Sequence, residues 1–178
     1  MTPQAASLMA EYNRWMNERM YDAAATLDAA TLAADKGAFF GSILGTLNHI
    51  ATADTIWLHR FARFEPSFDS LGALSRFPQP SSLTQRLAPD LAGLRSYRRE
   101  LDALITRWVA ELQPEHLSSD LSYGNMAGVQ SRRRLDALLQ HFFNHQTHHR
   151  GQASTLLFQS GVDIGVTDLL AVIPRSDA

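Results

Sequence analysis

Apolar side chains recur at every third or fourth position along four stretches of the chain, a spacing typical of amphipathic helices. The first stretch follows Thr2 and Pro3, a capping residue with a proline at the first helical position, and its apolar positions continue to Leu27. The second stretch predicts a helix over 42–64. Because the connection between these two helices is short, we expect them to be antiparallel neighbours.

The rest of the chain carries the helical spacing twice more. A third helix is expected to begin near Ser82 or Pro89, after a loop rich in proline, glycine and serine. The segment 117–131 is typical of a loop with two short strands. A fourth helix is expected to begin near Arg132 and to end by Gly161.

Four long helices without a strand pattern of domain size predict an all-α fold, a four-helix bundle that forms a single domain over 1–178. The connections before and after the third helix are about 15–20 residues long, enough to run the length of a bundle. An up-down-down-up order of helices is one arrangement that such connections allow. In bundles of this kind, cofactor sites are built from side chains on facing helices.

The composition limits the chemistry that the chain can perform. It has 178 residues and no cysteine, which excludes disulfides, zinc–thiolate sites, iron–sulfur clusters and a cysteine nucleophile. Its 16 Lys and Arg residues are balanced by 18 Asp and Glu residues, which argues against a nucleic-acid-binding surface. The sequence shows neither a signal peptide nor an apolar run long enough to span a membrane, so we expect a cytoplasmic protein without membrane partners.

The fourth predicted helix carries an unusual concentration of histidines. With His145 as the reference at about 100° per residue, His149, His141, His148 and Gln152 all fall within about 60° of it on one helical face. Residues four apart in a helix bring their Cβ atoms to about 5–6 Å, so His145 and His149 could direct ring nitrogens toward one ion. Any metal in this chain must be bound by histidine, carboxylate or water, which makes this face the leading candidate.

Two imidazoles alone make a weak site, so a metal would need a third ligand from another helix. His49 is the candidate, because it lies midway along the second predicted helix. Its neighbours one turn before and after, Gly45 and Ala53, are both small. We expect these small residues to leave space for an ion and its remaining ligands.

Four segments in order along the chain carry a resemblance to a known family: 42–57 around His49, 144–152 around His145, and more weakly 12–17 and 123–125. In these segments the chain resembles the DinB family of damage-inducible proteins. The run from His145 to Gln152, with its His-Xaa-Xaa-Xaa-His-Arg-Gly-Gln pattern, is the most specific of them.

The resemblance implies a four-helix bundle, usually a homodimer, that binds a divalent metal through His49, His145 and His149. Enzymes of the wider superfamily transfer or isomerise groups with a low-molecular-weight thiol such as bacillithiol, mycothiol or glutathione. Many members have no known reaction, and the family name is no indication of DNA repair. These implications are expectations for this chain.

Three neutral imidazoles leave at least one coordination position of an ion open, as in catalytic rather than structural sites. A water or a thiol bound there would be activated. Nickel, zinc and iron(II) all accept such ligands, and the sequence does not decide between them. Because the chain has no cysteine, any thiol must come from an external molecule.

No carboxylate is well placed to act as a general base beside these histidines. Asp54 lies about 140° around the helix from His49, so we expect it to support a neighbouring helix or to orient a ligand. His148 or His141 could serve as the base. The amide of Gln152 could hold a water or a substrate oxygen.

Several other conspicuous residues have an ordinary structural interpretation. We expect the tryptophans to lie in the core, the three arginines of 132–134 and those at 95, 98 and 99 to be solvated, and Arg150 to form a structural salt bridge. The leading hypothesis is a metal-dependent enzyme that acts on a small molecule, with thiol-dependent transfer favoured over hydrolysis. The alternatives are a non-catalytic metal-binding stress protein and a structural dimer with buried histidines.

Overall fold

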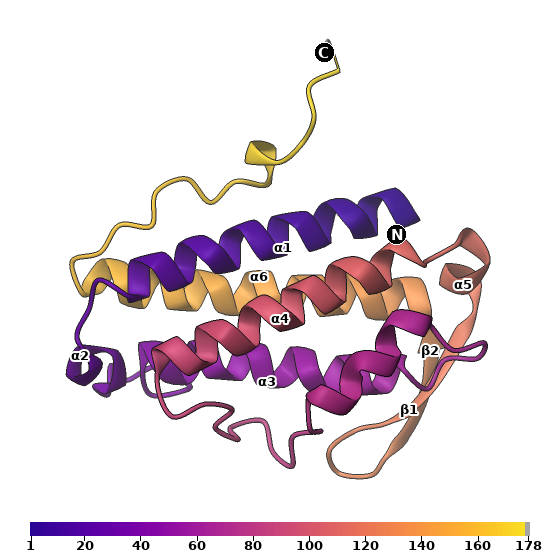
Figure 1. Cartoon of the computed structure of the whole chain (residues 1–178), viewed down its shortest axis with the longest axis horizontal. Coiled ribbons are helices and arrows are strands. Elements are labelled where there is room, and N and C mark those ends of the chain that lie inside the picture. Colours follow the sequence, from indigo (N-terminus) through magenta and orange to yellow (C-terminus); the bar gives the residue numbers. More distant parts are fainter. Residues whose placement is uncertain (177–178) are drawn as a thin grey trace.

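Four long helices dominate the computed structural model of the chain, which describes residues 1–176 (Figure 1). They are α1 (Pro3–Ala24), α3 (Ile43–Phe61), α4 (Leu91–Ala110) and α6 (Leu135–Gln159). Helix α1 packs against α4 and α6, and α3 packs against α6 and α4. The predicted all-α four-helix bundle is therefore confirmed. The prediction that the first two long helices are neighbours is wrong, because α1 and α3 lie diagonally across the bundle.

The helices follow the up-down-down-up order, with α1 and α6 running one way and α3 and α4 the other (Figure 1). The connection from α3 to α4 includes the 3-10 helix η1 (Asp69–Arg76) and returns along the length of the bundle. The connection from α4 to α6 stays at one end, where it forms α5 (Pro114–Ser118) and a hairpin of β1 (Asp120–Gly124) and β2 (Gln130–Arg134). Of the two long connections, only the first spans the bundle.

The first predicted helix ends earlier than its apolar pattern. Helix α1 stops at Ala24, one turn before Leu27. The chain turns there because the side chain of Asp28 accepts a backbone N–H at 2.7 Å and caps a separate short helix, α2 (Ala29–Ala33). Helix α3 then begins after Ser42, whose hydroxyl caps it in the same way.

The third helix begins at Leu91, where Asp90 accepts a backbone N–H of the first turn at 2.8 Å. A start near Pro89 is close to this boundary, whereas a start near Ser82 is wrong. Residues 83–84 form a turn and residues 85–87 have no regular structure. The backbone of this segment bonds to the side chains of Asn48 and His49 on α3 and does not form a helix.

The fourth helix begins at Leu135, so the prediction of a start near Arg132 is wrong. The two predicted strands are present, but the second extends through 130–134 and includes that arginine. In the antiparallel hairpin Asp120 is paired with Arg134, and the Asp120 carboxylate forms an ion pair with Arg132 at 3.0 Å. These cross-strand contacts hold the arginines in a strand.

Two groups of buried apolar side chains fill the bundle, one toward each end. Along α3, Ile43 and Leu47 belong to one group, Leu58 and Phe61 to the other, and the buried Asp54 lies between them. The other long helices also carry buried polar residues near the boundary between the two groups. We call the buried polar side chains at this middle level the polar layer: Asn13, Asn17, Asp54, Arg98, Asp102, Gln146 and Arg150.

Arg98 corrects the prediction that the arginines of the third helix are solvated. Arg99 is exposed and Arg95 is half-buried, but Arg98 is only 2% exposed. Its guanidinium lies 2.6 Å from the carboxylate of Asp54 and 2.7 Å from that of Asp102. A buried charge needs such partners, and the two carboxylates provide them.

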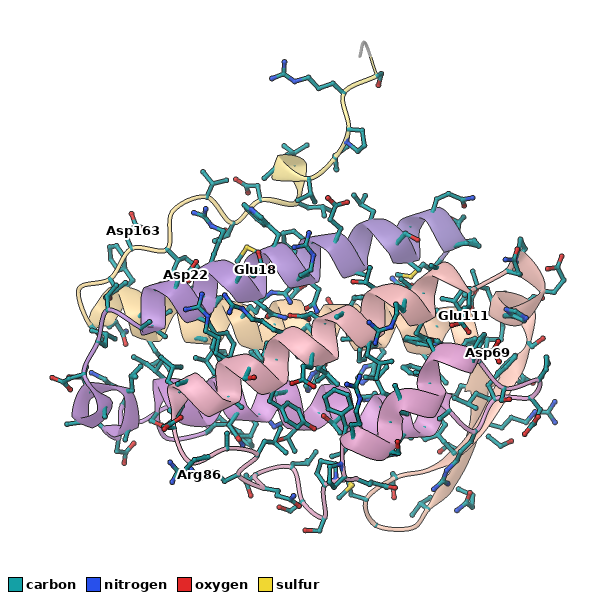
Figure 2. All side chains as sticks on the ribbon, viewed as in Figure 1. Glu18, Asp22, Asp69, Arg86, Glu111 and Asp163 are labelled. Carbon is teal, nitrogen blue, oxygen red and sulfur yellow. The ribbon has the colours of Figure 1, made fainter. Side chains whose placement is uncertain are left out.

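The segment after α6 returns alongside α1. The backbone oxygen of Ile164 accepts a hydrogen bond from Arg19 at 2.6 Å, and that of Thr167 accepts one from Tyr12 at 2.6 Å. Figure 2 shows Asp163 of this segment and Arg86 of the long connection at opposite edges of the bundle. None of the helices in residues 1–176 combines the length and apolarity that crossing a bilayer requires.

Candidate metal centre

Three histidines from two facing helices form a compact cluster. His49 of α3 lies opposite His145 and His149, which are one turn apart on α6. One ring nitrogen from each residue lies within 4.8 Å of the other two. The Nε2 atoms of His145 and His149 are 3.1 Å apart, and the ring centroids of His49 and His149 are 4.6 Å apart. The structure therefore brings together the three residues that the sequence nominates as ligands, in a group that could hold a metal ion.

Two of these imidazoles are held from behind by hydrogen-bond acceptors. The Nδ1 atom of His49 lies 3.0 Å from the carbonyl oxygen of Leu83, and that of His149 lies 2.7 Å from Oε1 of Gln152. Because both partners accept, each Nδ1 carries the proton and each Nε2 directs its lone pair into the cluster. Outer partners of this kind orient histidine ligands in metal sites.

Burial keeps the cluster uncharged at neutral pH. It lowers the pKa of His49 and of His149, and it lowers the pKa of His145 to about 3, with the neighbouring imidazoles adding to that shift. Neutral imidazole is the form that binds metals. Three such nitrogen donors fit zinc, nickel or iron(II), whereas calcium and magnesium prefer oxygen ligands.

An aromatic side chain from the loop before α3 covers one side of the cluster. The ring of Phe40 stacks on His49 with centroids 3.7 Å apart and contacts His149 edge-on at 5.4 Å. The loop approaches so closely that a Cβ on Gly45 would collide with the carbonyl oxygen of Phe40. The prediction that Gly45 leaves space for the ion is therefore wrong, because the Phe40 backbone fills that space.

The residues predicted to assist catalysis lie around the cluster. The amide of Gln152 contacts His149 through its oxygen, and its nitrogen lies 3.4 Å from Nε2 of the exposed His148. His141 lies on the other side, with its ring centroid 6.0 Å from that of His145. The structure places these side chains beside the candidate ligands, and their catalytic roles stay predictions.

A cavity of about 380 Å³ opens next to the cluster. Its wall includes His145 and His141, together with Trp57 and Arg60 of α3 and residues 125–127 of the hairpin loop. This volume lies within the usual range of small-molecule sites. A larger cavity of about 600 Å³ lies near the beginnings of α2 and α4, but none of the candidate site residues lines it.

Two further predictions concern residues near the cluster. Asp54 supports a neighbouring helix, as predicted, because its carboxylate is paired with Arg98 of α4. Arg150 is buried and structural, but it forms hydrogen bonds to neutral groups in place of the predicted salt bridge. Within residues 1–176 its guanidinium donates to the side-chain oxygens of Asn13 and Thr147, and neither group is charged.

Comparisons with known proteins show the family of the chain. The family model described as DinB family matches residues 1–175. The chain belongs to the DinB family. It is similar to Protein DinB of Bacillus subtilis (strain 168), with 26% identity over 159 residues that cover 89% of this chain and 87% of that protein. The fold of this DinB-family protein is similar to that of a DinB-like protein from Bacillus cereus ATCC 10987, with a TM-score of 0.57, 20% identity and coverage of 92% and 93%.

Three residues around this candidate site were not predicted from the sequence. Leu83 acts through its backbone carbonyl, so its side chain carries no signal of that role. Phe40 lies in a loop, where an aromatic residue has no helical period to indicate which way it faces. Arg60 lines the cavity. The one sequence signal for it is its position three residues after Trp57, on the same face of α3.

Proposed function

We propose that this DinB-family protein is a metal-dependent enzyme that binds a divalent ion through His49, His145 and His149 and acts on a small molecule in the adjoining cavity. One observation supports this above all. The Nδ1 protons of His49 and His149 are directed outward to Leu83 and Gln152, which leaves Nε2 lone pairs converging beside an open cavity.

A divalent ion at this position would supply Lewis-acid activation of a bound thiol or water. The chain has no cysteine, so a thiol would have to be an external low-molecular-weight molecule. The cavity wall, as far as residues 1–176 form it, contains no Asp or Glu to serve as the base for hydrolysis. We therefore favour thiol-dependent transfer of a group over hydrolysis.

The surrounding side chains take supporting roles in this proposal. His141 lines the cavity, and burial lowers its pKa, so its ring is neutral at pH 7 and can accept a proton from a substrate. His148 is the second candidate base. Gln152 acts as a positioning residue, because its oxygen fixes the tautomer and the orientation of His149.

Metal analysis tests the ligand set directly. Protein purified without an affinity tag should contain close to one equivalent of nickel, zinc or iron per chain, measured by plasma mass spectrometry. His49→Ala should lose most of that metal, whereas His59→Ala, a change on the same helix but outside the cluster, should retain it. Metal-free wild-type protein, or equal metal in both variants, would refute the proposed site.

Activity assays then separate an enzyme from a metal-binding stress protein. Metal-loaded protein should conjugate thiols such as glutathione or bacillithiol to electrophiles, and the rate should fall with His49→Ala. A panel of esters and amides tests hydrolysis in parallel. Confirmed metal with no turnover in either panel would favour the non-catalytic alternative. The homodimer that the resemblance implies stays a prediction, which sedimentation equilibrium would test.

A further inference from the structure

Arg60 is a half-buried cation at the edge of the cavity. Its Cζ lies 4.5 Å from the ring centroid of Trp57 and 5.3 Å from that of Tyr123, so two aromatic rings support the guanidinium. None of the ion pairs within residues 1–176 involves it. An aromatic ring compensates a partly desolvated charge less well than a carboxylate does.

The electrostatics of the cavity favour an anion. Burial lowers the pKa of Arg60; Tyr123 opposes that shift, and the nearby positive charge of Arg63 adds to it. The described residues of the cavity wall include no carboxylate that would repel a negatively charged ligand. A bound metal ion at the histidine cluster would make the same cavity still more positive.

The rest of the wall is mainly apolar. Ala53, Ile56, Leu83 and Met126 contribute aliphatic surface to it. A mainly apolar wall with a few polar groups, here Arg60, Asn125 and the two histidines, is typical of sites that orient a small organic molecule. The volume of about 380 Å³ suits a small metabolite and not a macromolecule.

A continuous series of contacts connects Arg60 to the cluster. The ring centroid of His141 is 6.0 Å from that of His145 and 5.1 Å from that of Trp57, and Trp57 in turn contacts Arg60. A ligand along this wall would therefore reach the candidate metal at one end and the guanidinium at the other. The α3 residues of the wall run from Ala53 to Arg60, which is about 10 Å of helix rise, so an elongated molecule fits best.

We propose that this cavity recognises a small carboxylate-bearing molecule with an apolar body, whose carboxylate binds Arg60 while its reacting group lies at the histidine cluster. The inference rests on the proposed function for the position of the reacting group. Arg60 is the specificity-determining residue, because its planar fork of N–H donors matches a carboxylate in a bidentate contact.

A matched pair of probes tests this assignment. The ligands are 6-mercaptohexanoate and 6-mercaptohexanol, which share the thiol and the apolar chain and differ in the terminal charge. Their affinities are measured by calorimetry on metal-free protein, and by the sulfur-to-metal charge-transfer band on cobalt(II)-loaded protein. We expect the wild type to bind the carboxylate about tenfold more tightly than the alcohol, in line with a charged hydrogen-bonded pair.

Variants of the arginines identify the source of that preference. Arg60→Gln should reduce the ratio to about one, and Arg60→Lys should retain part of it, because it keeps the charge but loses the fork. Arg63→Gln, an exposed change three residues away, and Arg133→Gln, in a neighbouring cavity lined by Trp57 and Tyr123, should preserve it. Circular dichroism and thermal melting confirm that each variant is folded.

The outcomes distinguish the two proposals. Equal affinity for both probes, or a carboxylate preference that survives Arg60→Gln or is lost with Arg133→Gln, overturns the assignment of Arg60. A preference that depends on Arg60 in calorimetry, combined with no charge-transfer band for either probe, supports the assignment and contradicts the metal site. A charge-transfer band without a carboxylate preference supports the metal site and contradicts the assignment of Arg60.

Discussion

Which nitrogen of each imidazole carries the proton decides whether the cluster can bind an ion. In His49 and His149 the hydrogen-bond acceptors at Nδ1 place the proton on that atom. The Nδ1 of His145 is buried and has no hydrogen-bond partner within residues 1–176. Two of the three candidate ligands are therefore oriented in advance, and the third can adjust to the ion.

Removing the partner of His149 should weaken metal binding without removing a ligand. Gln152→Ala takes away the acceptor at 2.7 Å from Nδ1, so the ring is free to turn and to change tautomer. We expect the affinity for zinc or nickel to fall by about tenfold to a hundredfold, measured by competition with a chelator. Gln159→Ala, an exposed change at the end of the same helix, should leave the affinity unchanged. Equal affinities for all three proteins would show that Gln152 does not orient His149.

The lowered pKa of His145 should make the metal-free protein less stable in mild acid. Between its folded pKa of about 3 and the ordinary value of 6.5, the unfolded chain binds a proton that the folded chain does not. Stability is therefore lost as the pH falls below about 6.5, by roughly 1 kcal/mol at about pH 5 after allowance for partial exposure. Urea unfolding at pH 7 and pH 5 should show a smaller loss for His145→Gln, which cannot titrate. An identical loss in both proteins would show that the titration of His145 does not cause the loss of stability.

At the scale of secondary-structure elements, α3 and the connection that follows η1 act together. The amide of Asn48 donates to the carbonyl oxygen of Gln85 at 2.8 Å and accepts from the backbone N–H of Leu87 at 2.9 Å. These bonds hold the segment 83–87 against α3 and so place the carbonyl of Leu83 beside Nδ1 of His49. The connection is therefore part of the candidate site.

The helices and the pair of candidate ligands on α6 could be predicted from the sequence because both depend on regular spacing. The apolar period locates α3 and α6, and four-residue spacing on α6 places His145 and His149 on one face. The segment 83–87 obeys no such period, since its backbone is held by the side chain of Asn48 from another element. Hydrogen bonds between distant segments leave no local pattern, which explains why the start of α4 and the role of Leu83 could not be predicted.

Two glycines near the candidate ligands should respond to alanine in opposite ways. Gly45→Ala would push its Cβ into the carbonyl of Phe40, so the loop and the ring that covers His49 must move. We expect a loss of about 1–3 kcal/mol in unfolding free energy and weaker metal binding. Gly151→Ala is the control, because a Cβ there meets open space on α6, and it should stabilise the protein by up to about 1 kcal/mol. Chemical denaturation measures both, and a harmless Gly45→Ala would mean that the loop does not pack as described.

At the scale of the whole molecule, the polar layer links all four long helices. Asn17 and Asn13 of α1 donate to the carboxylate of Asp102 at 3.0 and 2.9 Å, and Arg98 joins that carboxylate to Asp54 of α3. Arg150 of α6 donates to the amide oxygen of Asn13. These contacts form only when the polar residues of all four helices lie at the same level of the bundle. The layer therefore sets the register of α3 against α6, and this register places His49 opposite His145.

Arg98 is the residue on which the layer depends most. Burial raises the pKa of Asp54 to about 6 even though the charge of Arg98 opposes the shift, so both carboxylates rely on this guanidinium. Arg98→Leu would leave them buried without a cation, and we expect a loss of about 3–5 kcal/mol at pH 7. Arg99→Leu, the exposed neighbour, should change stability by no more than about 0.5 kcal/mol.

The pH dependence of Arg98→Leu separates a charge effect from a packing effect. Without the guanidinium the carboxyl pKa values rise further, so the folded variant retains protons that the unfolded chain releases above its ordinary pKa of 3.8. Stability of the variant therefore falls as the pH rises, and its deficit against wild type should be smaller at pH 5 than at pH 7.5 in urea unfolding. A deficit that is equal at both values would mean that Arg98 contributes through its volume, and the charge would then have no part in setting the helix register.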